Sequence, residues 1–128
     1  TAEISEIIKR FNIGQSTFEN FLKNNKLRSP IRVWSHHFDL GIYTQLNKSG
    51  TLFLGAGLAI PDILVDDMYY YASGWKNGEG IRTESFTGLD IGEWRSDWSG
   101  ATLASSNMNE HLVELFLKEA SMRYLSEA

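Results

Sequence analysis

The sequence contains no cysteine. A chain without cysteine forms no disulfide bond and binds no metal through a thiolate, so zinc fingers, dithiol redox motifs and cysteine nucleophiles are all excluded. Any metal ion would have to be held by histidine, aspartate or glutamate side chains. Histidine itself is scarce, with three residues in 128, so candidate metal ligands are few.

The chain also lacks a basic cluster and a long apolar run. Its 16 acidic and 12 basic residues give a net charge of −4 and are scattered, which disfavours binding to a phosphate backbone. No stretch approaches the ~20 apolar residues of a membrane span. The opening TAEISEIIKR carries charges where a signal peptide needs an apolar segment. We therefore expect a cytoplasmic protein that binds neither nucleic acid nor membrane.

The length fits one domain. A chain of 128 residues buries roughly two thirds of its unfolded surface, enough for a core without disulfides or structural metals. The sequence begins with Thr1 inside a helical pattern rather than with methionine. We expect residues 1–128 to form a single domain taken from a longer protein.

Residues 1–28 have helical periodicity and predict a pair of helices. Apolar residues recur at helical spacing up to Phe11, and Gly14 predicts a break. Ser16 and Glu19 then form a capping box, which opens a second helix. Both helices have one apolar face and are expected to cover a sheet.

Residues 31–86 predict a small antiparallel sheet of three to four strands. From Ile31 the periodicity changes to two, which is typical of a half-buried strand. The NKSG turn leads into TLFLGAGLAI, which predicts a hairpin whose second strand is central, and the glycines of that strand indicate a close approach of backbone or ligand. MYYYASGW predicts a third strand, KNGEG a turn, and IRTESF a fourth strand.

Continuous alternation along the first strand assigns its residues to two faces. The face expected to contact the core carries Trp34, His36, Phe38, Leu40, Ile42, Thr44 and Leu46, and the opposite face carries Val33, His37, Asp39, Gly41, Tyr43 and Gln45.

Residues 105–127 predict a closing helix. Ser105–Asn107 supplies the N-cap, and the apolar residues that follow form a stripe at helical spacing. The segment between the sheet and this helix, TGLDIGEWRSDWSG, is expected to be a long loop. The fold class is therefore α+β, with helices packed on one face of an antiparallel sheet.

Two adjacent histidines and an aspartate interrupt the apolar segment VWSHHFDLG. Strand alternation places His37 and Asp39 on one face and His36 on the other. Two such neighbours can bind one cation together, or the carboxylate can orient the imidazole as a general base. This pair is the candidate catalytic and metal-binding centre.

A metal site needs at least one further ligand, and His111 or Glu93 can complete it, with His111 as the third metal candidate. The alternative is structural. His36 is then a buried histidine with a satisfied hydrogen bond, and His37 and Asp39 bond each other or a loop backbone and pin the sheet.

Aromatic side chains are frequent, at 12% of the residues. Trp75, Trp94 and Trp98, together with the tyrosines at 69–71, can line a pocket for a flat or sugar-like ligand. The alternative is that they pack in the core and the loops, which is the commoner role of large aromatic side chains. The GAG of residues 55–57 lacks the spacing of a dinucleotide fingerprint or a P-loop, and no nucleophile elbow is present.

The segments SPIRVWSHHFDLG, YYYASGW, GEW, WSGATL and HLVELFLKEA, in this order, resemble the C-terminal half of an uncharacterised group of bacterial proteins known as a domain of unknown function. The resemblance covers about residues 29–125. It implies no activity, but it implies an additional N-terminal region that this chain does not carry. The motifs match His36, the pair His37 and Asp39, and the ligand-binding candidates Trp34, Tyr71, Trp75, Glu93, Trp94 and Trp98.

These observations predict a non-catalytic binding or interaction domain without a cofactor. The N-terminal region or a second copy of the chain is the expected partner. The alternative is a metal-dependent hydrolase that uses His37 as ligand or base and Asp39 as its partner.

Overall fold

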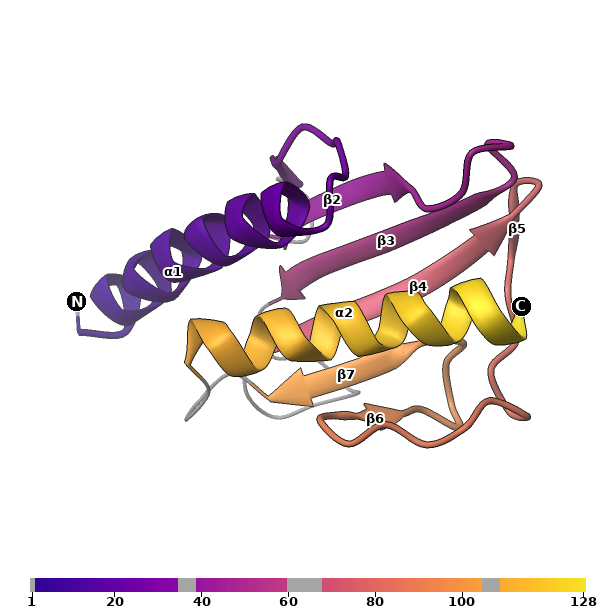
Figure 1. Ribbon diagram of the computed structural model, residues 1–128. Helices are drawn as coiled ribbons and strands as arrows, with labels where there is room; N and C mark the ends of the chain where they lie inside the picture. The colour runs from indigo at the N-terminus through magenta and orange to yellow at the C-terminus, as the bar shows by residue number, and fades with distance from the viewer. Residues whose placement is uncertain (1, 35–38, 60–67, 105–108) are drawn as a thin grey trace.

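The computed structural model describes residues 2–34, 39–59, 68–104 and 109–128 and confirms the α+β class (Figure 1). The elements are α1 (Ala2–Asn24), β1 (Arg32–Trp34), β2 (Asp39–Gln45), β3 (Leu52–Ala59), β4 (Tyr69–Lys76), β5 (Glu79–Gly80), β6 (Glu93–Trp94), β7 (Ala101–Ala104) and α2 (Glu110–Glu127). Within the described residues the strands form one antiparallel sheet in the order β1-β2-β3-β4-β7-β6, with β5 paired to β4. The sheet therefore has seven strands, more than the three to four predicted.

Both helices lie on the same face of the sheet (Figure 1). Helix α2 packs on β3, β4 and β7, while α1 packs on β2 and against α2. The core between the layers is apolar, with Phe18 and Phe21 from α1, Leu54 and Leu58 from β3, and Phe116, Leu117 and Tyr124 from α2 all buried. No helix in the described ranges is long and apolar enough to cross a membrane.

The N-terminal region is one helix, and the predicted pair is wrong. Gly14 lies inside α1 and is buried, because this is where the helix packs closely on the sheet. A Cβ at Gly14 would lie 2.9 Å from Leu58 Cδ2 and 3.2 Å from Leu40 Cδ2. Glycine is therefore present here for close packing, and its cost in helix propensity, about 1 kcal/mol, is outweighed by tertiary contacts.

The segment from Ile31 to Leu46 is two strands, β1 and β2, and the single continuous strand is wrong. The two pair antiparallel, with Val33 opposite Leu40 and Trp34 opposite Asp39 in backbone register. Val33 is thus in register with Leu40, on the opposite face from the one predicted, although its side chain is 61% exposed and outside the core, as predicted. Alternation cannot be continued through a reversal of the chain, although it holds within β2, where Leu40, Ile42 and Thr44 are buried as predicted.

The predicted hairpin is confirmed. Strands β2 and β3 pair antiparallel, and β3 lies between β2 and β4. The NKSG turn closes it, with the Asn47 carboxamide oxygen accepting from the backbone N–H groups of Thr51 and Leu52 at 3.1 Å each.

The predicted fourth strand, IRTESF, is wrong, because the chain returns from β4 by a tighter turn. Asn77 and Gly78 both have positive φ, 51° and 83°, as a two-residue type I′ hairpin requires. The return strand is β5, and its pairing ends at Gly80. Ile81 still donates its N–H to the Gly74 carbonyl oxygen of β4 at 2.9 Å, and residues 82–86 then leave the sheet, with a turn bond from the Phe86 N–H to the Thr83 carbonyl oxygen.

The segment predicted as a long loop contains β6 and leads into β7. These strands have two and four residues, too short for a periodicity of two to be recognised in the sequence. Strand β7 pairs with β4 on one side and β6 on the other, so it extends the sheet beyond β4.

The closing helix is confirmed, but its N-cap is Asn109 rather than a residue of Ser105–Asn107. The Asn109 Oδ1 accepts from the Leu112 N–H at 2.9 Å. Residues 105–108 lie outside the described part of the chain.

Replacing Asn109 by alanine is expected to lower the free energy of unfolding by about 1 kcal/mol, because the Leu112 N–H loses its acceptor at the helix terminus. Urea unfolding followed by circular dichroism measures the change. The Asn109→Asp variant keeps an acceptor oxygen and serves as the control, with stability close to that of the parent. Equal loss in both variants would exclude the capping role.

Candidate functional site

The face of the sheet opposite the helices is the candidate site, and we call it the open face. Because residues alternate along each strand, those between the core positions lie on this face. Cross-strand register arranges them in rows, with Tyr43, Gly55 and Ser73 in one row and Gly57 and Tyr71 in the next. No helix of the described part covers these rows (Figure 1).

Three aromatic side chains from three neighbouring strands, Tyr43, Phe53 and Trp75, form what we call the aromatic platform. Tyr43 and Phe53 stack with ring centroids 4.9 Å apart and planes 8° from parallel. Phe53 stands opposite Trp75 in register. Tyr43 is 51% exposed and Trp75 37% exposed, so the platform presents aromatic surface to solvent.

Gly55 lies next to the platform, and we call its immediate surroundings the Gly55 niche. A Cβ at Gly55 would lie 3.2 Å from Ser73 Oγ, 3.4 Å from Trp75 Nε1 and 3.8 Å from Tyr43 Cδ1. One tyrosine ring, one hydroxyl and one indole N–H therefore surround the same point. Gly55 itself is partly exposed.

The two polar groups of the niche have different hydrogen-bonding states. Ser73, 9% exposed, donates its hydroxyl proton to the Gly55 carbonyl oxygen at 3.4 Å, which leaves its oxygen lone pairs available to accept. The Trp75 indole N–H has no acceptor among the residues that the structure describes. The niche thus offers one donor and one acceptor side by side.

A second polar group on the open face joins Asp39 and Tyr71. The Tyr71 hydroxyl donates to Asp39 Oδ2 at 2.7 Å, and the Tyr71 ring contacts the edge of Trp98 with centroids 6.0 Å apart. The ring lies over Gly57, where a Cβ would overlap it and would lie 2.7 Å from the Leu40 carbonyl oxygen. Glycine is therefore required beneath Tyr71.

Burial raises the pKa of Tyr71 above its ordinary value, and the hydrogen bond to Asp39 and the negative charge of that carboxylate raise it further. The phenol stays protonated at neutral pH and acts as a hydrogen-bond donor that orients the carboxylate. Burial also raises the pKa of Tyr124, and raises that of Tyr70 to about 12.

These shifts predict a loss of stability in alkaline solution. A tyrosine whose pKa is raised on folding ionises first in the unfolded chain, so its contribution is complete below pH 10 and is lost as pH rises above 10. Comparing the urea unfolding of the parent with that of Tyr71→Phe isolates the contribution of Tyr71 to the free energy of unfolding. We expect their difference in free energy of unfolding to be constant from pH 7 to 9 and to shrink by about 1 kcal/mol at pH 11. A difference that does not change with pH would contradict the shift.

The predicted centre around His37 lies partly outside the described residues, which exclude His36 and His37. Asp39 is described, and its contact with Tyr71 was not predicted from the sequence. His111 is exposed on α2 and lines a cavity of about 280 Å³ between the helices, with Asn24, Asn25, Glu114, Leu115 and Lys118. It therefore lies in the helical layer, on the other side of the sheet from Asp39.

No three histidine, aspartate or glutamate side chains gather to hold a metal ion in the part of the chain that the structure describes. Asn24 Nδ2 donates to Glu114 Oε1 at 2.5 Å beside His111 and ties α1 to α2. The groups around His111 are thus arranged as a connection between helices.

The predicted ligand-binding residues separate into two groups. Tyr71, Trp75 and Trp98 lie on the open face or contact it. Trp94 lies on the helical side, where its ring packs edge-on against Phe86 and Tyr124, with centroids 5.3 and 5.5 Å apart. For Trp34 only the backbone pairing with Asp39 is described.

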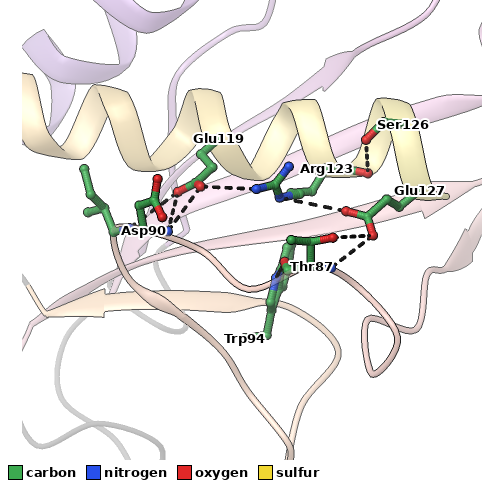
Figure 2. A network of polar contacts seen from close by, with 8 residues as sticks. Thr87, Asp90, Trp94, Glu119, Arg123, Ser126 and Glu127 are labelled. Carbon is green, nitrogen blue, oxygen red and sulfur yellow. Dashed lines mark hydrogen bonds and ion pairs between the residues drawn. The ribbon is translucent and has the colours of Figure 1, made fainter.

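The Trp94 indole N–H is engaged in the network that Figure 2 shows. It donates to the Thr87 carbonyl oxygen at 2.9 Å, and the Thr87 N–H and hydroxyl donate to Glu127 Oε1 at 3.0 Å each. Glu119 accepts from the Asp90 N–H at 2.9 Å, and Arg123 lies between the two glutamates with ion pairs of 3.6 and 3.8 Å. This network fastens the loop at residues 87–91 to α2.

Glu93 accepts from Arg95 Nη1 at 3.0 Å, and the same guanidinium binds both oxygens of Asp97 at 3.2 Å. Arg95, Asp97 and Trp98 line a cavity of about 160 Å³ at the turn between β6 and β7. The carboxylate of Glu93 is therefore held by an arginine.

Phe53 and Ser73 were not predicted as members of the site. Both belong to strands whose two faces are apolar or small, so alternation gave no sign of which face each residue occupies. The glycines at 55 and 57 were the available signal, since glycine within a strand marks a close approach.

Comparisons with models of protein families, with curated proteins and with solved structures found no match.

Proposed function

We propose that this protein is a non-catalytic binding domain and that the open face is its binding surface. The observation that carries the proposal is the exposed aromatic platform, whose Trp75 indole N–H has no acceptor among the described residues. Large aromatic side chains supply contact area at a low cost in conformational entropy, and a donor without a partner is available to a ligand.

The shape of the open face also supports binding over catalysis. Gly55 presents partly exposed backbone of β3 beside the aromatic platform, and the Asp39 carboxylate accepts a hydrogen bond from the protonated Tyr71 phenol. The metal-dependent hydrolase stays a prediction, because its His37 lies outside the described residues. A cytoplasmic location, the bacterial family relationship, a second copy or N-terminal region as partner, and the lack of nucleic-acid binding also stay predictions.

Fragment mapping by NMR tests the proposal without knowledge of the ligand. Small aromatic and polyhydroxylated fragments are titrated into the ¹⁵N-labelled protein at millimolar concentrations. We expect the largest shifts at Tyr43, Gly55 and Trp75, including the Trp75 indole N–H. Shifts confined to the cavity beside His111, or to the loop at residues 87–91, would overturn the proposal.

A further inference from the structure

We propose that the outer surface of the helical layer pairs two copies of this chain, with α2 of one copy packed antiparallel on α2 of the other. Both helices lie on one side of the sheet, and the open face lies on the other side (Figure 1). The pairing is therefore a second interaction, and its test does not depend on the proposed function.

Helix α2 carries apolar side chains on both of its faces. Its inner face is buried in the core, whereas Leu115, Met122 and Leu125 are 38%, 55% and 51% exposed. Among the described residues, five of the eight large apolar side chains that are exposed lie on the two helices, the other two being Ile8 and Ile13 of α1. Exposed apolar side chains that gather on one surface are typical of a protein interface.

The exposed residues of α2 up to Leu125 follow the spacing of a helix that packs along another helix. They are His111, Leu115, Lys118, Met122 and Leu125, separated alternately by four and three residues. This spacing keeps the side chains along one line of the helix surface, as at the contact positions of a coiled coil. The outer face of α2 is thus suited to contact with a second helix.

Two successive hollows lie along this row. The first, which we call the His111 hollow, has a volume of about 280 Å³ and is bordered on α2 by His111, Glu114, Leu115 and Lys118. These residues have the spacing i, i+3, i+4, i+7 of the four positions that surround an inserted side chain when two helices pack. The end of α1 forms the other wall of this hollow.

The second hollow, which we call the Met122 hollow, has a volume of about 390 Å³. It repeats the same spacing four residues further along α2, with Leu115, Lys118, Glu119 and Met122. The loop at residues 87–91 forms its other wall. A helix laid along α2 can therefore insert one side chain into each hollow.

The two hollows differ in polarity. The Met122 hollow presents the apolar side chains of Ile91 and Met122. Its Glu119 is already bound by Arg123, at 3.6 Å. The His111 hollow contains the Glu114 carboxylate, which attracts a cation. The Met122 hollow thus favours an apolar side chain, and the His111 hollow favours a lysine or an arginine.

A second copy of this chain supplies both side chains. When two α2 helices pair antiparallel about a two-fold axis at the level of residues 116–117, position 115 of each copy lies at the level of position 118 in the other. Leu115 of one copy then enters the Met122 hollow of the other. Lys118 enters the His111 hollow beside the Glu114 carboxylate. Lys118 has no ion pair among the residues that the structure describes, so the second copy provides its partner.

Sedimentation equilibrium of the parent, from about 10 µM to about 1 mM, tests the pairing. We expect a monomer–dimer equilibrium with a Kd on the order of 100 µM or lower, because the contact covers little more than one helical face. A protein that remains monomeric at the highest concentration would overturn the inference.

One substitution on each side of the sheet locates the interface. Leu115→Glu places a carboxylate in the Met122 hollow of the other copy, where Glu119 lies, and is expected to raise the dimer Kd at least about tenfold. Tyr43→Glu is the matched control, because it introduces the same charge at an exposed residue of the open face, and it should leave the Kd unchanged. Equal effects of the two substitutions, or a larger effect of Tyr43→Glu, would assign the contact elsewhere and overturn the inference.

Exchanging the charges at positions 114 and 118 tests the antiparallel register. Lys118→Glu and Glu114→Lys each place like charges opposite one another in the dimer, so each variant alone should dimerise at least about tenfold more weakly than the parent. In a 1:1 mixture of the two variants, every contact between positions 114 and 118 regains opposite charges, and the mixed dimer should form about as tightly as the parent dimer. A mixture as weak as the separate variants would contradict the inference.

Thermal melting of each variant separates a loss of pairing from a loss of folding. Leu115 and Lys118 are exposed, so we expect both variants to melt close to the parent. If Leu115→Glu does not fold, the charge exchange decides the question, because it is read from two variants whose mixture restores the dimer.

Discussion

Replacing Tyr124 by alanine is expected to lower the free energy of unfolding by about 3–5 kcal/mol. Tyr124 is fully buried near the end of α2, and its ring packs edge-on against Phe86 and Trp94, with centroids 5.3 and 5.5 Å apart. It joins the helix, β4 and the loop that precedes β6. Truncation removes this contact area and leaves a cavity that the surrounding strands cannot fill. Urea unfolding followed by circular dichroism measures the loss.

The Tyr124→Phe variant is the control, because it keeps the ring and removes only the hydroxyl. We expect its stability to lie within about 1 kcal/mol of the parent, because the ring keeps its contacts with Phe86 and Trp94. A loss as large as that of Tyr124→Ala would assign the effect to the hydroxyl and contradict the packing argument.

A double-mutant cycle with Gly74 checks the same contact from the strand. A Cβ at Gly74 would overlap the Tyr124 ring and lie 2.8 Å from its Cζ atom. Gly74→Ala is therefore expected to destabilise the parent by about 1–3 kcal/mol and to have a much smaller effect when residue 124 is alanine. Additive effects of the two changes would show that the residues are not in contact.

The fold was predictable where one periodicity persists over many residues. The closing helix and β2 were predicted correctly because burial on one face fixes a repeat of 3.6 or 2, and the NKSG turn predicted the hairpin with β3. The errors arose where tertiary contacts override local preference. Gly14 predicts a helix break by propensity, yet it allows α1 to approach Leu40 and Leu58. Strands as short as β6 and β7 carry no detectable repeat.

The candidate site was predictable only in part. The sequence pointed to Asp39, Tyr71 and Trp75, but it could not show that Trp75 is exposed whereas Trp94 is packed beside Tyr124. Each of these tryptophans lies in a strand and is followed in the sequence by a basic residue. What distinguishes their environments is the face of the sheet on which each side chain lies. That face depends on register with β3 and β7, which is a property of the folded chain.

Replacing Gly57 by alanine is expected to destabilise the protein by about 1–3 kcal/mol and to release Tyr71 from Asp39. The added Cβ would overlap the Tyr71 ring, and it would also lie 2.7 Å from the Leu40 carbonyl oxygen. That carbonyl belongs to β2, which is paired with β3, so it cannot retreat without disturbing the sheet. The Tyr71 ring must therefore move away and lose its 2.7 Å hydrogen bond.

Absorbance titration of the tyrosines separates this effect from a general loss of stability. In Gly57→Ala the pKa of Tyr71 should fall toward its ordinary value, because burial and the bond to Asp39 both raise it in the parent. An unchanged titration together with unchanged stability would show that Tyr71 does not lie over Gly57.

The Gly55→Ala variant is the matched comparison two residues along the same strand. Its Cβ would meet Ser73 Oγ at 3.2 Å and Trp75 Nε1 at 3.4 Å, side-chain atoms that can shift slightly, so a loss of less than about 1 kcal/mol is expected. The two substitutions should then differ in their effect on stability. Gly57 is required for the packing of Tyr71 and hence for stability, whereas a Cβ at Gly55 meets only side-chain atoms, so its replacement should leave the protein folded with the contact between Tyr71 and Asp39 intact.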